Sequence, residues 1–174
     1  DLAYTTYGHA VGLRDLGPTM APMNAYLTIM GIETLALRME KHVANAEVVA
    51  NYLHNHAKVS WVSYAGLEES NYFHLAKKYL PKGAGSVFTF GIKGGYDAGV
   101  KFVEKCQLLS HLANIGDTRS LVLHPASTTH RQLTETQRIS AGAGDDVIRL
   151  SIGLETVEDI ICLLYTSDAA DDLR

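Results

Sequence analysis

The sequence predicts an α+β fold in which helices pack on a mainly antiparallel sheet. Segments with helical and extended patterns alternate along the chain, and several connections between them are short, which favours such a layered arrangement. A third observation is the helical spacing of apolar residues from Met23 to about His56, which predicts one long helix leading into the sheet. Three to five strands are expected in the domain that follows.

The sequence predicts where the long helix begins and where it bends or breaks. Pro22 suits a first helical turn, because its missing N–H would have no helical partner there. Gly31 is where we expect a kink or an interruption. One face of this helix is assigned to the following positions at helical spacing: Leu27, Met30, Thr34, Leu37, Lys41 and Ala44.

The remaining elements follow from changes of period. Alternating, β-branched or aromatic runs predict strands at 59–66, 86–92 and 147–152, with short extended pieces at 112–116 and 121–125. Helices are predicted at 71–80 and 97–109, from the capping box of Thr134 and Gln137 to about 142, and from about Thr156. The last ten residues, YTSDAADDLR (165–174), are polar and acidic without periodicity. We expect a non-native tail there that does not pack stably.

Composition excludes several classes of function. The net charge is −4 and no run of Lys or Arg exists to neutralise phosphates, so we predict no nucleic-acid partner. No run of 18 apolar residues occurs, so no membrane span is expected. Cys106 and Cys162 form no C-x-x-C motif, and two lone cysteines favour the reducing cytoplasm over a disulfide framework. The chain opens at Asp1 without an initiator Met, which indicates a fragment.

Arg149 interrupts a run that is otherwise typical of a buried strand, VIRLSI (147–152). A guanidinium cannot be deprotonated, and burying it without a partner costs several kcal/mol. It therefore either pairs with an internal carboxylate such as Asp117, or lies at a sheet edge, or holds the carboxylate of a ligand through two parallel N–H···O bonds. From spacing alone these interpretations remain open.

The segment LHPASTTH (123–130) combines an extended entry at Pro125 with small and hydroxyl side chains. Such a segment can hold an anion, or it can be a Ser/Thr-rich turn that caps its neighbours. His124 and His130 have no Cys or acidic partner nearby, so no metal site is predicted. The residues alone leave open whether the chain is part of an enzyme.

Four separated segments carry a resemblance. LRDLGPTMAPMNAYLTIMGIETLALRMEKH, KYLPKGAGSVFTFGIKGG, LLSHLANIGDTRSLVLHPASTTHRQLT and IRLSIGLETVEDII resemble, in this order, the C-terminal part of the pyridoxal-phosphate enzymes of cysteine and methionine metabolism. The resemblance covers about residues 1–163, and SHLANIGD and KYLPKGAG are most similar to the O-acetylhomoserine sulfhydrylase branch. It implies the C-terminal small domain of a fold-type I enzyme.

The resemblance also implies roles for three residues. Arg149 would hold the α-carboxylate of the amino-acid substrate, Asn114 would help to hold it, and Thr129 would support it. No catalytic residue is expected in this chain, because the family's Schiff-base lysine lies in an upstream S-x-x-K segment that is absent here. Pyridoxal 5'-phosphate would be held by a large domain outside this chain, and no residue of the chain is predicted to bind it.

The implied organisation has three parts. Residues 1–21 would end the large-domain or linker region, 22–163 would be the long helix and the small domain, and 164–174 the tail. The whole enzyme would be a cytoplasmic homotetramer that makes homocysteine from O-acetyl-L-homoserine and sulfide for methionine biosynthesis, the fragment itself being inactive. The alternatives are a methionine γ-lyase or cystathionine γ-synthase-like enzyme, or a catalytically empty binding or oligomerisation module.

Overall fold

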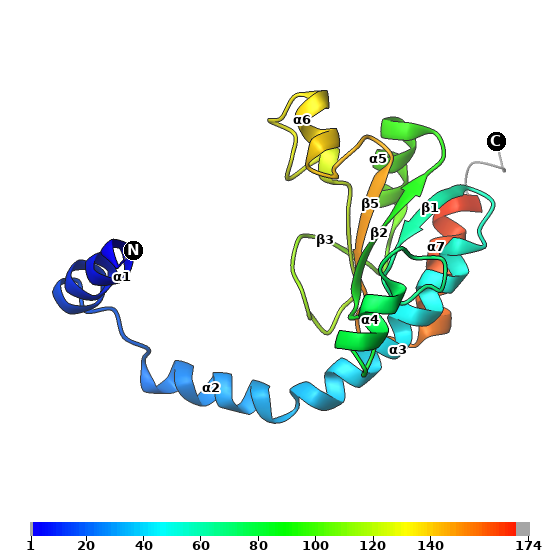
Figure 1. Ribbon diagram of the computed structural model, residues 1–174. Helices are drawn as coiled ribbons and strands as arrows, with labels where there is room; N and C mark the ends of the chain where they lie inside the picture. Colours follow the sequence, from blue (N-terminus) through cyan, green and yellow to red (C-terminus); the bar gives the residue numbers. More distant parts are fainter. Residues whose placement is uncertain (1, 170–174) are drawn as a thin grey trace. The chain divides into compact units, whose positions relative to one another are not determined.

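The computed structural model describes residues 2–169, with side chains as far as Leu164, and divides into two compact units (Figure 1). The first unit ends at Ala36 and the second begins at Leu37. The boundary expected after residue 21 concerns the large-domain and linker region of the whole enzyme and stays a prediction. No residue of the helix from Pro22 to Glu33 is buried.

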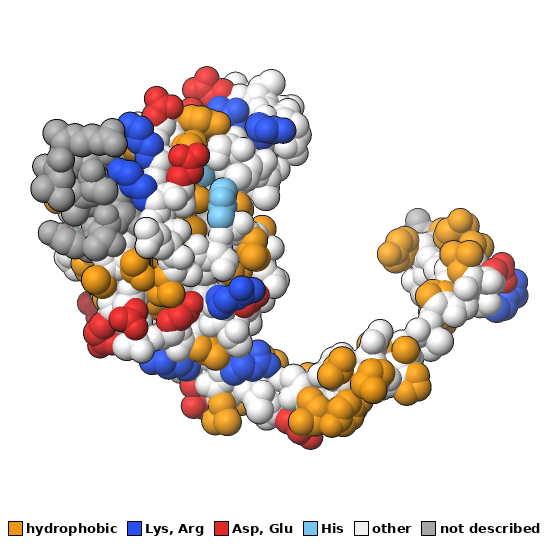
Figure 2. Space-filling view, turned by 180° about the vertical axis from the view of Figure 1, so that it is seen from behind, with side chains coloured by type: hydrophobic (Ala, Val, Ile, Leu, Met, Phe, Trp, Pro, Cys, Tyr) orange, Lys and Arg blue, Asp and Glu red, His pale blue; other side chains and the backbone are white. Residues whose placement is uncertain are grey.

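The first unit consists of three helical segments. They are α1 (Ala3–Tyr7), the π-helical η1 (Gly8–Asp15) and α2 (Pro22–Glu33). Pro22 occupies the first turn of α2, as the sequence predicts. Hydrophobic side chains are exposed along α2, and Figure 2 shows them on its surface; they include Met23, Tyr26, Leu27, Ile29, Met30 and Ile32.

The sequence predicts one long helix over about 22–56 with a kink or an interruption at Gly31, and the structure shows the helix interrupted. The chain forms α2 and then α3 (Leu35–His54), and the two are separated at Thr34, whose φ of −104° and ψ of 3° lie outside the helical range. We expected the break at Gly31, and it falls three residues later, at Thr34. The branched side chain of a threonine is restricted in a helix, which makes it a weak helix former.

The second unit is built on a five-stranded sheet with the order β1-β2-β5-β4-β3. Neighbouring strands run antiparallel except β3 and β4, which are parallel. This confirms the predicted α+β fold with a mainly antiparallel sheet. The strands are β1 (Val59–Ser63), β2 (Val87–Ile92), β3 (Ser110–His111), β4 (Leu121–Leu123) and β5 (Val147–Ser151).

The predicted extended piece at 112–116 is not a strand. The short strand of this region is β3, and residues 112–116 form part of the loop between β3 and β4. Leu112 and Ile115 are both exposed, so their apolar character does not report a buried strand.

Helices cover the face of the sheet that carries the main core. Side chains from α3, α5 (Gly95–Lys105) and α7 (Val157–Ala169) pack with Phe88, Phe90, Ile148 and Leu150 of the central strands. The shorter helical segments are α4 (Phe73–Tyr79), η2 (Pro125–Ser127) and α6 (Glu135–Ser140). The capping box of Thr134 and Gln137 is present at the start of α6, as predicted.

The expectation that residues 164–174 form a tail without regular structure is wrong for its first part. Helix α7 continues to Ala169, and Leu164 is only 3% exposed within the core. The helix predicted from about Thr156 is present, and its last residues were missed because YTSDA (165–169) shows no apolar periodicity of its own. Residues 170–174 lie outside the described residues. Among the described residues, no helix is both long and apolar enough to cross a lipid bilayer.

Candidate functional site

Arg149 lies in the middle of β5, on the face of the sheet opposite to the main core. Its neighbours Ile148 and Leu150 are fully buried in that core, and side chains alternate between the two faces of a strand. Arg149 pairs with Thr89 of β2 on one side and with Leu123 of β4 on the other. The side chain is half-buried, so part of it lies against the sheet and part of it is accessible to solvent.

The guanidinium of Arg149 contacts the loop between β3 and β4. Its Nη2 donates a hydrogen bond of 3.3 Å to the backbone carbonyl oxygen of Asn114. In the part of the chain that the structure describes, Arg149 forms no ion pair with a carboxylate. The guanidinium therefore keeps a full positive charge and several free donors on this face.

Asp117 is not the partner of Arg149, which removes the internal ion pair as an interpretation. Its Oδ1 accepts from the backbone N–H of Arg119 at 3.1 Å and lies 3.7 Å from Arg119 Nε. The backbone hydrogen bond from Arg119 is the main reason that the pKa of Asp117 is lowered from its ordinary value. Asp117 is a turn residue that stays ionised, and such a carboxylate is a poor general base.

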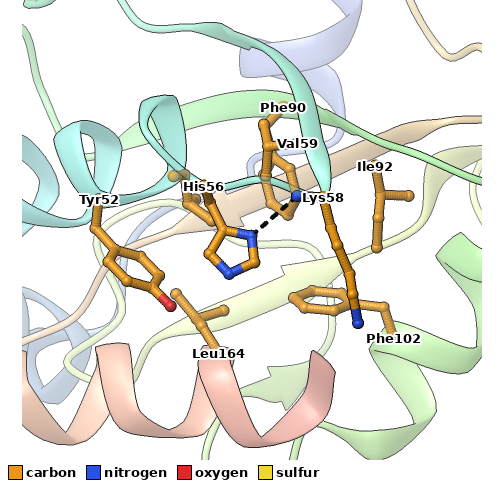
Figure 3. Close-up of a pocket in the computed structure, with 9 residues that line it drawn as sticks. Tyr52, His56, Lys58, Val59, Phe90, Ile92, Phe102 and Leu164 are labelled. Atoms are coloured by element: carbon orange, nitrogen blue, oxygen red, sulfur yellow. Dashed lines mark hydrogen bonds between the residues drawn. The ribbon is translucent and has the colours of Figure 1, made fainter. Parts of the chain in front are cut away.

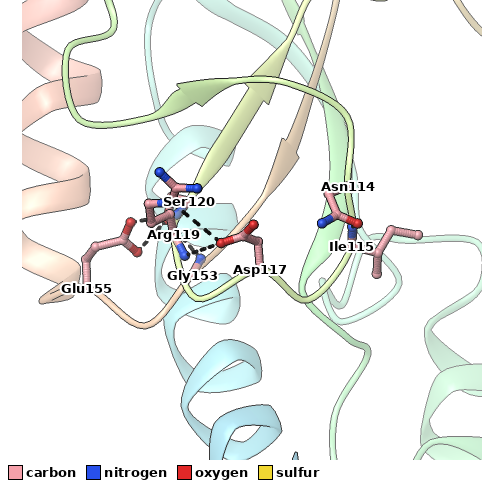
Figure 4. A network of polar contacts seen from close by, with 7 residues as sticks. All are labelled: Asn114, Ile115, Asp117, Arg119, Ser120, Gly153 and Glu155. Atoms are coloured by element: carbon pink, nitrogen blue, oxygen red, sulfur yellow. Dashed lines mark hydrogen bonds and ion pairs between the residues drawn. The ribbon is translucent and has the colours of Figure 1, made fainter. Parts of the chain in front are cut away.

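Asn114 lies on the same loop and is exposed. Its side-chain Oδ1 accepts from the backbone N–H of Ile115 at 2.9 Å, and both residues lie on the loop drawn in Figure 4. The backbone carbonyl of Asn114 accepts from Arg149. The structure thus brings together two of the three residues that the resemblance proposed. A hydrogen bond from the side chain of Asn114 also contributes to the lowered pKa of Asp117.

Thr129, the third residue that the resemblance proposed, contacts His130. It follows η2 in an exposed position, and its Oγ1 lies 2.8 Å from Nδ1 of His130. Within the described residues Thr129 forms no hydrogen bond with Arg149 or Asn114. Its role beside the substrate carboxylate stays a prediction.

The turn that carries Thr129 is built around His124, which is completely buried. His124 Nε2 lies 3.0 Å from the carbonyl oxygen of Asp145, and Nδ1 lies 2.9 Å from Ser127 Oγ. The hydroxyl of Thr128 donates to the carbonyl oxygen of His124 at 2.7 Å. His124 is thus a satisfied internal residue that joins this turn to the entry of β5, and no cluster of potential metal ligands occurs among the described residues.

Polar residues of α3 that sequence reasoning missed hold the chain directly after β5. His42 and Asn45 are 0% and 2% exposed, and they lie on the helix face that also buries Ala46, Val49 and Leu53. The signal that could have found them is the spacing itself, because both occupy core positions of a helix that is otherwise polar at its surface. The predicted face through Lys41 and Ala44 is wrong, since both are exposed.

The lysines do not provide a site for a carbonyl cofactor. None of the described lysines is buried: Lys93 Nζ donates to the carbonyl oxygen of Ala57 at 2.6 Å, and Lys77 and Lys78 lie over the rings of Phe73 and Tyr79. A lysine that reacts with a carbonyl needs an enclosed environment that lowers its pKa. Among the described residues, no lysine lies in such an enclosed environment.

Two hollows occur elsewhere in the second unit. One is an apolar cavity of about 20 Å³ between α3, the sheet and α7, lined among others by Tyr52, Phe90, Phe102 and Leu164 (Figure 3). It has room for about one water molecule and none for an amino acid. The other is an open hollow of about 300 Å³ beside α4, and it includes neither Arg149 nor Asn114.

Comparison with known proteins gives a consistent result. The model of a family described as Cys/Met metabolism PLP-dependent enzyme matches residues 5–167. The O-acetyl-L-homoserine sulfhydrylase of Leptospira meyeri is 48% identical over 162 residues, which are 92% of this chain and 37% of that protein. The homocysteine synthase of Schizosaccharomyces pombe is 50% identical over 161 residues, 92% of this chain and 38% of that protein.

A crystal structure from Campylobacter jejuni is also similar, with a TM-score of 0.85 and 43% sequence identity. The aligned region covers 94% of this chain and 39% of the Campylobacter jejuni chain. That protein is named provisionally as an O-acetylhomoserine (thiol)-lyase and contains N'-pyridoxyl-lysine-5'-monophosphate, a lysine joined to the cofactor. This chain spans 37% and 38% of the length of the two curated relatives above.

Proposed function

This chain belongs to the Cys/Met metabolism PLP-dependent enzyme family, and we propose that it provides the substrate-carboxylate site of an O-acetyl-L-homoserine sulfhydrylase. In the proposed reaction sulfide replaces acetate at the γ-carbon of O-acetyl-L-homoserine, which gives homocysteine and acetate. The names of the relatives support this substrate class.

One observation carries the assignment of the site. Arg149 is the middle residue of a buried strand, it forms no ion pair with a described carboxylate, and a backbone carbonyl holds its Nη2 in place. A half-buried guanidinium that forms no internal ion pair keeps N–H donors that a ligand carboxylate can accept from. The α-carboxylate of an amino acid has the planar shape that a guanidinium binds through two N–H···O bonds.

Arg149 acts by binding and breaks no bond. The hydrogen bond to Asn114 uses one of its five N–H donors, so enough donors remain for a carboxylate. Fixing the carboxylate fixes the α-carbon next to it, and correct placement of a reacting atom is a large part of catalysis. We further propose that Asn114 and Thr129 support the same carboxylate.

The cofactor of this family accepts the electrons that are released at the substrate's α-carbon. We propose that residues outside the aligned part of the fold hold it, since no described lysine lies in an enclosed environment. The cytoplasm and a homotetramer belong to the same proposal. The sequence has only two cysteines, Cys106 and Cys162, and they form no C-x-x-C motif, which favours a reducing compartment over a disulfide framework.

A chimera tests the proposal. Residues 5–167 of this chain would replace the aligned part of the Leptospira meyeri enzyme, and homocysteine formation from O-acetyl-L-homoserine and sulfide would be measured beside the parent enzyme. We expect a kcat/KM within about tenfold of the parent, because the carboxylate site is retained. The amount of 2-oxobutanoate formed by elimination would be measured in the same reactions.

The outcomes are distinct. A chimera that shows the cofactor's absorbance, melts like the parent and makes no homocysteine would refute the proposal. A chimera that releases mainly 2-oxobutanoate would favour a γ-lyase. Cystathionine formed from added cysteine in preference to homocysteine would favour a cystathionine γ-synthase.

A further inference from the structure

Glu155 joins two chain segments that are far apart in the sequence. Its Oε1 accepts from the backbone N–H of Ser120 at 2.6 Å, and its Oε2 accepts from the hydroxyl of the same serine at 2.8 Å (Figure 4). The hydroxyl oxygen of Ser120 in turn accepts from the backbone N–H of Gly153 at 2.8 Å. One carboxylate and one hydroxyl thus tie the start of β4 to the turn after β5.

The hydrogen bonds of this group leave little freedom. The single proton of the Ser120 hydroxyl goes to Glu155, and its oxygen takes the proton of Gly153. Ser120 is 0% exposed, so water cannot substitute for a lost partner. The backbone N–H of Leu154 also donates to the carbonyl oxygen of Thr118 at 2.8 Å, which extends the contact between the two segments.

The turn after β5 is itself anchored on α3. Asn45 Nδ2 donates to the carbonyl oxygens of Gly153 and Glu155 at 3.0 and 2.8 Å. His42 Nδ1 lies 2.6 Å from the carbonyl oxygen of Ile152, and since a carbonyl only accepts, this nitrogen donates. The backbone that carries Glu155 is therefore fixed to a helix, and the loop that begins at Asn114 is the part that Glu155 can position.

That loop ends at Ser120 and contains the carbonyl group that holds Arg149. Between these two points the backbone N–H of Arg119 is bonded to Asp117, so the loop has an internal brace as well. Moving Ser120 away from Glu155 would release the loop from its anchor on the turn after β5. The carbonyl oxygen of Asn114 would then no longer orient the guanidinium of Arg149.

We propose that Glu155 is a positioning residue: it clamps Ser120 to the turn after β5 and thereby sets the orientation of Arg149 toward the substrate carboxylate. This inference rests on the proposed function, in which Arg149 holds that carboxylate. Glu155 does not touch the substrate. Both of its oxygens are engaged by Ser120.

Two substitutions separate this role from general stabilisation. Glu155→Gln replaces one acceptor oxygen by an N–H₂ group that faces the hydroxyl of Ser120. Glu158→Gln is the matched control, because Glu158 is an exposed residue in the first turn of α7. Amide hydrogen exchange would be measured on the 174-residue chain, and kinetics on the chimera.

The expected results are specific. Exchange at the amide of Ser120 should accelerate by about tenfold in Glu155→Gln and stay unchanged in Glu158→Gln. In the chimera Glu155→Gln should raise KM for O-acetyl-L-homoserine by about threefold or more, with a smaller change in kcat. In an Arg149→Ala background the same substitution should have almost no further effect on kcat/KM, because residues that act through one another are not additive.

The failures can be told apart. If the effects of Glu155→Gln and Arg149→Ala on kcat/KM multiply in an active chimera, Glu155 does not act through Arg149 and the positioning role is refuted. The same holds if Glu155→Gln lowers only the melting temperature. If the unsubstituted chimera binds its cofactor and is inactive, the proposed function itself fails, and the inference fails with it.

Discussion

The guanidinium of Arg149 and the backbone carbonyl of Asn114 meet at 3.3 Å, although the two residues are 35 positions apart in the sequence. The contact joins the middle of β5 to the loop between β3 and β4. It gives the arginine a fixed direction without neutralising its charge, because a peptide carbonyl carries only a partial negative charge. A ligand carboxylate can therefore still gain the full ionic interaction.

Substitution of Arg149 tests this directly in the chimera. Arg149→Lys keeps the charge and loses the forked geometry, and Arg149→Ala loses both. A hydrogen bond to a charged group is worth about 1.5–3 kcal/mol, so kcat/KM should fall at least about tenfold for Lys and further for Ala. Cofactor absorbance should barely change. An Arg149→Lys variant that melts early and keeps a near-normal kcat/KM would show that the residue is structural.

Gly153 should tolerate no side chain. A Cβ at this position would lie 2.5 Å from the carbonyl carbon of Arg119, the amide nitrogen of Ser120 and a carboxylate oxygen of Glu155. Gly153→Ala should therefore lower the free energy of unfolding of the 174-residue chain by about 1–3 kcal/mol in urea titrations. Gly144→Ala is the control, because its Cβ would meet only side-chain atoms at 3.3 and 3.7 Å. Equal effects of the two substitutions would contradict the tight packing.

Tyr64 should make the stability depend on pH in the alkaline range. Burial, with a smaller contribution from Glu47, raises the pKa of Tyr64 from 10.0 to about 12. Between these values the unfolded tyrosine loses its proton while the folded one keeps it, so stability is present below pH 10 and falls as the pH rises toward 12. Urea midpoints at about pH 9 and about pH 11.5 should differ less in Tyr64→Phe than in the unsubstituted chain. An equal difference would contradict the raised pKa; the exposed Tyr79→Phe serves as control.

His124 should carry its proton on Nε2 when it is neutral. The carbonyl oxygen of Asp145, which faces Nε2 at 3.0 Å, can only accept, whereas the Ser127 hydroxyl that faces Nδ1 can donate. Nitrogen NMR shifts of the ring should show this single tautomer, with exposed His74 as the reference. Ser127→Ala should cost about 1 kcal/mol of unfolding free energy, since it leaves a buried acceptor unpaired. A ring with its proton on Nδ1 would contradict this arrangement.

Local patterns predicted β1, β2, β4 and β5, because the information needed was contained in a few adjacent residues, whereas β3 was missed and the extended piece expected at 112–116 is a loop. The alternation around Arg149 gave both the strand and the unusual charge within it, and Thr134 with Gln137 gave the start of α6. The helix break was expected at Gly31 and falls at Thr34, and the buried face through His42 and Asn45 was not predicted. Helical spacing links these two residues to Ala46, Val49 and Leu53, but both are polar, so the apolar pattern did not include them.

The candidate site was less accessible to the same reasoning. Nothing in the composition or spacing singles out Asn114, which was proposed only through the resemblance, and the structure places its carbonyl on Arg149. Ser120 and Glu155 were missed because neither residue type stands out alone and the two are 35 positions apart in the sequence. Polar contacts of this kind are decided by the order of the strands in the sheet.

That order has a consequence for how the chain acquires its structure during synthesis. β5 lies between β2 and β4 in the sheet, yet it comes last in the sequence among the five described strands. Until the ribosome has released residues 147–151, β1 with β2 and β3 with β4 are two separate pieces, each with an unpaired edge where the sheet should continue. We therefore expect β2 and β4 to have unpaired backbone N–H and C=O groups until β5 is synthesised. β5 then pairs with both strands through contacts between residues distant in the sequence.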